Sequence, residues 1–132
     1  MKLIKHLYLP KDCLQGEEFP AYILYDKKFS PTIHIQFSEN VSLYRLFNVN
    51  KKDYQIEQNG VVIKKPEIEG YIGIVFRANR IKEHTVYEKI RFKIICQDIV
   101  ETVEKNILLF RPEIKLYKKP KKIIIEKDKN KL

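Results

Sequence analysis

The fold class is decided most directly by the stretch Tyr54-Gln55-Ile56-Glu57-Gln58-Asn59-Gly60-Val61-Val62-Ile63. Asn-Gly between two alternating segments favours a two-residue type I′ β-hairpin, because both turn residues tolerate a positive φ. That turn pairs Gln58 with Val61 and Ile56 with Ile63, so the two isoleucines share one face of the sheet. The stretch therefore predicts two adjacent antiparallel strands with one apolar side.

The composition of the whole chain agrees with a β protein. Its 132 residues include 19 Ile, 8 Tyr and 7 Phe but only 2 Ala and no Trp. β-branched and aromatic side chains suit a pleated, half-buried surface, whereas Ala is the preferred residue of helices. The chain is long enough for one domain with a sizeable core, and long amphipathic helices are not expected.

Further strands are marked by apolar residues at every second position. They are expected at residues 7–9, 19–25, 33–37, 41–49, 71–77, 90–96 and 103–110. Residues 98–105 could form a helix, but turn and strand are favoured. About eight or nine strands with short turns predict an all-β, antiparallel sandwich. The residues expected to be largely buried in its core are Ile35, Phe37, Ile56, Ile63, Ile74, Phe76, Phe92 and Ile94.

Three segments carry a family resemblance: Leu9-Pro10-Lys11 with Gln15-Gly16-Glu17-Glu18-Phe19, then Ala21-Tyr22-Ile23-Leu24, and finally Ile107-Leu108-Leu109-Phe110-Arg111-Pro112. In these segments the chain resembles the immunoglobulin-like β-sandwiches of archaeal and bacterial multidomain proteins, of the fibronectin-III or cell-adhesion-related kind. Arrestin-like sandwiches open with a similar Gly-Glu turn. The resemblance covers about residues 5–112 and implies a sandwich domain with a binding or scaffolding role. Because the composition changes after Arg111-Pro112, we expect a sandwich domain at residues 1–112 and a Lys-rich extension with a short strand at 113–132.

The extension is the predicted partner-binding segment. It concentrates the basic character of a chain whose net charge is +9, with eight lysines against three acids after Arg111. The triplet Ile123, Ile124 and Ile125 is strongly β-prone, and a lone apolar strand needs partners for its backbone groups. We expect this strand to mediate self-association or binding of a protein partner. The flanking lysines Lys118, Lys119, Lys121 and Lys122 would restrain indiscriminate aggregation.

Nucleic acid is the alternative partner, and the protein would then be a nucleic-acid or ribonucleoprotein accessory protein. The Lys-rich extension could neutralise phosphates. Tyr44 and Arg45, and the pair Arg91 and Lys93 around Phe92, place cations beside rings, as single-strand-binding proteins do. Phe92 lies in the inward phase of its strand, however, which favours a core position for that ring.

The sequence contains no motif for catalysis or for metal binding. His6, His34 and His84 lie in separate segments without ligand spacing, so no metal or cofactor is expected. The hydroxyl residues lack a neighbouring base, and an enzyme is not expected.

The two cysteines and the N-terminus bear on the compartment. Cys13 and Cys96 fit no metal or redox spacing and are expected to be two buried small hydrophobes; a disulfide is the alternative. The apolar start at Met1 is broken by Lys5, His6 and Pro10, so a signal peptide is not expected. The predicted location is cytoplasmic, and no membrane span is expected.

Overall fold

The computed structural model describes residues 2–112. The predicted extension with Ile123, Ile124, Ile125 and the flanking lysines lies outside the described residues. Within residues 2–112 the elements are β1 (Ile4–Tyr8), β2 (Asp12–Leu14), β3 (Glu18–Tyr25), β4 (Thr32–Gln36), β5 (Val41–Phe47), the 3-10 turn η1 (Lys51–Asp53), β6 (Tyr54–Glu57), β7 (Gly60–Ile63), β8 (Tyr71–Ala78), β9 (Thr85–Cys96) and β10 (Ile99–Phe110).

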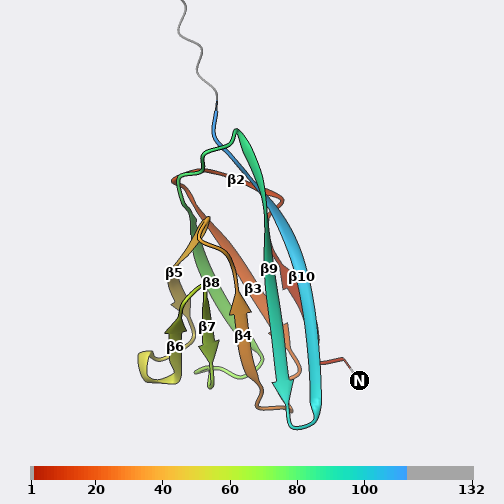
Figure 1. Ribbon diagram of the computed structural model, residues 1–132. Coiled ribbons are helices and arrows are strands. Elements are labelled where there is room, and N and C mark those ends of the chain that lie inside the picture. The colour runs from red at the N-terminus through yellow and green to blue at the C-terminus, as the bar shows by residue number, and fades with distance from the viewer. Residues whose placement is uncertain (1, 113–132) are drawn as a thin grey trace, which may run out of the picture.

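The ten strands form a sandwich of two sheets, which confirms the predicted fold class (Figure 1). One sheet has four strands in the order β1-β3-β8-β5, and the other has six in the order β2-β10-β9-β4-β7-β6. Every neighbouring pair is antiparallel except β2 and β10, which run parallel over Leu108–Phe110. The strand β2 lies between the strands expected at residues 7–9 and 19–25, where none was expected, and it brings the number of strands in the described residues to ten.

The core lies between the sheets and follows the alternation of the strands. Ile33 and Ile35 of β4, Ile90, Phe92 and Ile94 of β9, and Ile72, Ile74 and Phe76 of β8 are buried. Phe92 is 1% exposed, so its ring is a core side chain as predicted. Phe37 is only partly buried, and its ring meets the edge of Phe76 with the centroids 5.5 Å apart.

The predicted hairpin exists, but its register is wrong by one residue. Glu57 pairs with Gly60 and Ile56 with Val61, so the turn is Gln58-Asn59. Asn59 has φ 62° and Gln58 does not have a positive φ, which excludes a type I′ turn. Gly60 belongs to β7 instead, where an added Cβ would lie 2.8 Å from the carbonyl oxygen of Ile35. The glycine allows two backbones to approach closely.

The burial expected for Ile56 is wrong as well. This side chain is 63% exposed although its partner Val61 is buried. β6 is an edge strand of the six-stranded sheet, and the four-stranded sheet does not cover Ile56 there. Alternation predicts which face a residue occupies, but not whether another layer covers that face.

One carboxylate is buried within this apolar core. Glu88 of β9 is 2% exposed. It accepts hydrogen bonds from the backbone N–H of Ser38 at 2.7 Å, the hydroxyl of Ser38 at 2.6 Å and the amide of Asn40 at 3.4 Å. A buried charge is tolerated when it is satisfied in this way. Glu88 therefore fixes the turn between β4 and β5.

Candidate binding surfaces

The four residues predicted to contact nucleic acid lie on different sheets. Tyr44 and Arg45 belong to β5 of the four-stranded sheet, whereas Arg91 and Lys93 belong to β9 of the six-stranded sheet. Arg91 and Lys93 alternate with the buried Phe92, so they face outward on the far side of the sandwich from Tyr44 and Arg45. The fold therefore does not bring the two predicted clusters together.

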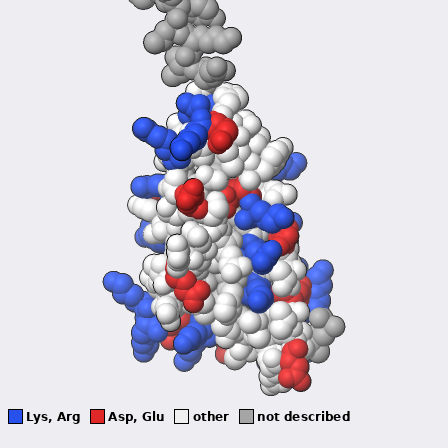
Figure 2. Space-filling model, in the orientation of Figure 1, with Lys and Arg blue, Asp and Glu red and all other residues white. Residues whose placement is uncertain are grey.

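The outer face of the six-stranded sheet has mixed charge. Figure 2 shows Lys and Arg interspersed with Asp and Glu over this face. Glu104 of β10 forms ion pairs with Arg91 at 2.6 Å and Lys89 at 3.6 Å. The hydrogen bond from Arg91 and the charges of both cations hold the pKa of Glu104 below its ordinary value. Two of the basic side chains on β9 are thus already paired with a carboxylate.

The outer face of the four-stranded sheet is different, because aromatic rings cross it. Tyr8, Tyr22, Gly73 and Phe47 lie directly opposite one another and form one row over all four strands. The rings of Tyr8 and Tyr22 stack with centroids 5.3 Å apart. We call the outward side chains His6, Tyr8, Tyr22, Phe47 and Tyr71 the aromatic face; its rim carries Tyr44, Arg45 and Arg77.

Gly73 interrupts the row, but the ring surface continues above it. A Cβ added to Gly73 would lie 2.9 Å from the hydroxyl oxygen of Tyr71 and 3.3 Å from Cβ of Phe47. Tyr71 and Phe47 therefore cover the glycine from both sides. Such covering of a strand glycine by aromatic residues stabilises sheets, and it also leaves the rings lying along the surface.

Two arginines are held over rings at the rim. The guanidinium of Arg45 lies 4.9 Å from the ring centre of Phe47, and that of Arg77 lies 4.7 Å from the ring centre of Tyr44. Tyr44 is the extra residue of a β-bulge between Leu43 and Arg45. The bulge re-aims this part of β5 and brings Tyr44 beside Arg77 of the neighbouring strand.

A group of lysines follows the end of β5, beginning four residues after Phe47. Lys51 and Lys52 of η1 come beside Lys64 and Lys65, because the backbone N–H of Lys64 donates to the carbonyl of Asp53 at 2.8 Å. We call these four exposed side chains the lysine corner. Lys and Arg gather at the corner of Figure 2 where Figure 1 places β6 and the adjoining turn. Among residues 2–112, none of the four lysines makes an ion pair.

Asn48 fixes the lysine corner relative to the aromatic face. It directly follows Phe47 and adopts a positive φ of 69°. Its side chain accepts from the N–H of Ile68 at 2.6 Å and donates to the carbonyls of Ile68 and Tyr71. The segment after Lys65 is therefore tied to the end of β5.

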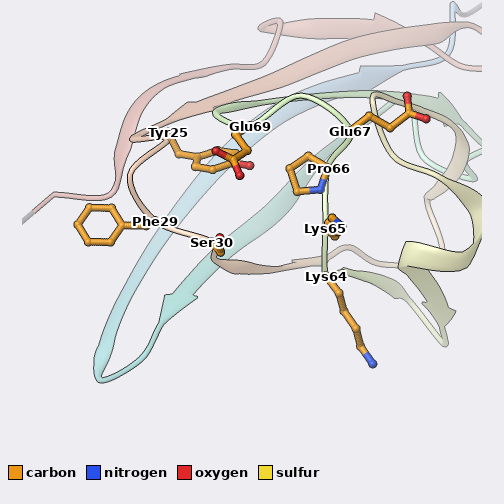
Figure 3. Close-up of a pocket in the computed structure, with 8 residues that line it drawn as sticks. All are labelled: Tyr25, Phe29, Ser30, Lys64, Lys65, Pro66, Glu67 and Glu69. Carbon is orange, nitrogen blue, oxygen red and sulfur yellow. The ribbon is translucent and has the colours of Figure 1, made fainter.

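A small pocket of about 250 Å³ lies beside this segment (Figure 3). Tyr25 lines it, and the buried Tyr25 hydroxyl has no hydrogen-bond partner among the described residues. Burial raises the pKa of this phenol. Ser30 also lines the pocket, but no histidine does, and the side chains of Phe29 and Lys64 point away from its centre in Figure 3. The volume is below the range of about 300–1,000 Å³ typical of small-molecule sites.

The six-stranded sheet leaves most of one strand edge open. The N–H of Leu108 donates to the carbonyl of Lys11, and the carbonyl of Phe110 accepts from the N–H of Gln15, at the two ends of β2. Even-numbered residues of β10 therefore direct their backbone groups away from β9. The remaining even-numbered residues, Val100, Thr102, Glu104 and Asn106, are exposed and have no strand beside them in the described part of the chain. We call this edge of residues 99–107 the open edge of β10.

The two cysteines lie far apart in the structure. Cys13 is opposite Leu109 and Cys96 is opposite Ile99, ten positions apart along β10, or about 33 Å. Both are free and buried, which excludes the alternative of a disulfide in this structure. Burial and nearby carboxylates raise the pKa of the Cys13 thiol.

Among residues 2–112, no three His, Cys, Asp or Glu side chains are grouped so that they could hold a metal ion. The described part of the chain also has no helix of the length and apolar character that a bilayer crossing requires.

The similarity of this chain to known proteins is a similarity of fold only. No protein-family model matches the chain, and no curated protein matches its sequence. Among solved structures, the major subunit of aggregative adherence fimbriae type I from Escherichia coli is similar with a TM-score of 0.53 and 8% identity, covering 83% of this chain and 94% of the subunit. The human F-spondin reeler domain (TM-score 0.47, 13% identity, 81% and 80% covered) and the collagen-binding domain of a Staphylococcus aureus adhesin (0.42, 11%, 79% and 96%) were also found. The chain thus has a β-sandwich fold similar to that of the fimbrial subunit.

Proposed function

We propose that this protein is a non-catalytic interaction module that assembles with copies of itself through the open edge of β10. The observation that carries the proposal is the set of backbone groups at Val100, Thr102, Glu104 and Asn106 that have no strand partner among residues 2–112. Such an edge accepts an added strand, which contributes main-chain hydrogen bonds along its whole length. The similar fold of a fimbrial subunit supports a role in assembly.

The edge is open because the strand beside it is short. β2 pairs with β10 only from Asp12 to Leu14. The residues before β2 leave this edge, and β1 belongs to the other sheet. The switch between the two sheets at residues 9–11 therefore leaves residues 99–107 of β10 without a strand beside them in the described part of the chain.

The strand that we propose to add is the C-terminal segment of a second copy, with Ile123, Ile124 and Ile125 at its centre. Twenty residues follow Pro112, and this triplet is their most β-prone part. A segment folding back onto its own β10 would have to cross β2, which already lies beside Leu108–Phe110. The lysines Lys118, Lys119, Lys121 and Lys122 would limit association to one docked arrangement.

The proposal includes the absence of catalysis and a cytoplasmic location. Two serine hydroxyls already make hydrogen bonds within the structure. The hydroxyl of Ser38 donates to Glu88 at 2.6 Å, and the hydroxyl of Ser42 donates to Asn79 at 3.1 Å. Neither of these bonds is to a histidine, the usual base for a nucleophile. The location remains a prediction from the sequence, as does the finer assignment to immunoglobulin-like domains.

Size-exclusion chromatography with light scattering tests the proposed assembly. Deleting residues 113–132 should leave a folded body that is monomeric, whereas the full chain self-associates. A triple variant Ile123→Ser, Ile124→Ser, Ile125→Ser should behave like the deletion. If the truncated protein unfolds, the segment belongs to the core; if it folds and assembles identically, the interface lies elsewhere. Either result would refute the proposal.

The second candidate is phosphate binding by the Lys-rich extension in a nucleic-acid or ribonucleoprotein complex, and it is favoured by the eight lysines after Arg111. The matched variant replaces Lys118, Lys119, Lys121 and Lys122 by Gln and keeps the isoleucines. Strand addition predicts that this variant still assembles and that assembly depends little on salt. Phosphate binding predicts loss of nucleic-acid binding and a steep decrease of affinity with salt in the parent protein.

A further inference from the structure

We propose that the aromatic face of the four-stranded sheet binds single-stranded nucleic acid, with bases stacked on its rings and phosphates directed to its rim and to the lysine corner. This site is separate from the open edge of β10 and from the C-terminal extension. It includes Tyr44 and Arg45 but excludes Arg91 and Lys93, which lie on the other sheet.

The rings are the first argument. Tyr8 stacks on Tyr22, and Tyr22 lies 6.5 Å from Tyr71, so the rings follow one another across three strands. Tyr8, Phe47 and Tyr71 are exposed although apolar surface is normally buried. Every base has a flat π-face, so an unpaired strand can use such rings whatever its sequence. An aliphatic protein partner would have no need of rings in particular.

The distribution of charge is the second argument. The four strands β1, β3, β8 and β5 hold a single carboxylate, Glu18, and it is already bonded to Arg77 at 3.0 Å. Basic side chains on the same strands are Lys5, Arg45 and Arg77. On the outer face of the six-stranded sheet, by contrast, Lys89 and Arg91 are paired with Glu104, and the exposed carboxylates of Asp12 and Glu57 lie on its two edge strands. An anionic ligand is therefore favoured on one outer face and not on the other.

The geometry of the cations is the third argument. The guanidiniums of Arg45 and Arg77 lie over the rings of Phe47 and Tyr44, 4.9 Å and 4.7 Å from the ring centres, so on these ring faces a base would stack on the guanidinium plane. Arg77 is also paired with Glu18, whereas Arg45 makes no ion pair among residues 2–112. The lysine corner contributes four ammonium groups, and the carboxylates of Asp53 and Glu67 lie close to them in the sequence. Asn48 ties this part of the chain to the end of β5. A strand lying on the rings could extend its phosphates to this corner. Rings and cations along one path are the combination that single strands require.

Fluorescence anisotropy of the full chain with a short fluorescein-labelled oligothymidylate tests the proposal. We expect Tyr8→Ala and Phe47→Ala each to weaken binding by about fivefold or more, the effect of losing one stacked base. The matched control is Tyr87→Ala, because Tyr87 is 74% exposed on the outer face of the other sheet. This control should bind like the parent protein, and circular dichroism should show all three variants folded.

Two further probes separate stacking from charge. An abasic oligonucleotide of the same length keeps the phosphates but offers no bases, and duplex DNA keeps its bases paired. Both should bind at least about fivefold more weakly than the single strand if stacking contributes. Equal binding of the abasic strand, an equal loss with Tyr87→Ala, or full retention with both ring variants would overturn the proposal.

The same result distinguishes this site from the extension. Binding by the extension would disappear on deletion of residues 113–132 and survive Tyr8→Ala. Binding by the aromatic face would show the opposite pattern. Absence of any binding to the single strand at low salt would also refute the inference, whatever protein or glycan the face then proved to bind.

Discussion

Replacing Glu88 by alanine should destabilise the fold by about 2–3 kcal/mol, although the residue is a charge in an apolar core. Its two short hydrogen bonds, from the N–H and the hydroxyl of Ser38, are charge-assisted. Each such bond contributes about 1.5–3 kcal/mol, and removal of the carboxylate also leaves the Ser38 N–H without its acceptor. Part of this loss is offset, because the variant no longer buries the charge of Glu88 and because water can reach the partly exposed Ser38. The expected net loss is therefore about 2–3 kcal/mol.

Urea denaturation followed by circular dichroism measures this effect. The midpoint should fall while the m-value stays constant, since the mutation changes stability and not the surface exposed on unfolding. Glu88→Gln keeps one acceptor oxygen and should lose about half as much. The control Glu57→Ala removes an exposed glutamate of β6 and should stay within about 0.5 kcal/mol of the parent. A loss below about 1 kcal/mol for Glu88→Ala would refute the argument that Glu88 fixes the turn between β4 and β5.

Three further predictions concern the core, the outer sheet face and the thiols. Phe92→Ala should cost about 3–5 kcal/mol in urea denaturation, whereas Ile56→Ala should cost less than about 1 kcal/mol; similar losses would contradict the register described for β6 and β7. Glu104 has a lowered pKa in the folded state, so the parent should be more stable than Glu104→Gln at neutral pH. This advantage should vanish as the pH falls through the folded-state pKa, and a pH-independent difference would exclude the ion pairs as its source. Cys13 and Cys96 should react with Ellman's reagent at neutral pH only as fast as the protein opens, because both are buried and the Cys13 thiol is held protonated; immediate reaction would show an exposed thiol.

Much of the architecture could be predicted from the alternation of apolar residues. Phe92 and Ile94 fall on the core face of β9 because a strand places every second residue on the same side. The hairpin turn was misplaced because Asn59-Gly60 fits a type I′ turn locally. The tertiary fold needs the glycine elsewhere, where the backbone of β7 approaches Ile35. Local turn preference was overridden by a contact between distant segments.

The candidate binding surfaces could be predicted only in part. Tyr44 and Arg45 were candidates from the sequence because they are adjacent there, and their role in binding remains a prediction. Tyr8, Tyr22 and Tyr71 come from three strands, and their common row depends on the registers of β1 and β8 with β3. The open edge of β10 likewise depends on β2, whose three residues give too short a pattern to predict a strand. Cross-strand register is the information that a single sequence does not display.

Hydrogen exchange at the open edge of β10 tests the proposed assembly most directly. The amides of Val100, Thr102, Glu104 and Asn106 have no backbone acceptor in the described residues and should exchange fast in the truncated protein, residues 1–112. In the full chain we predict that these four amides become protected as the protein concentration rises, while the neighbouring amides bonded to β9 are protected throughout. Fast exchange at the four positions at every concentration, or protection that does not depend on concentration, would contradict assembly by strand addition from a second copy.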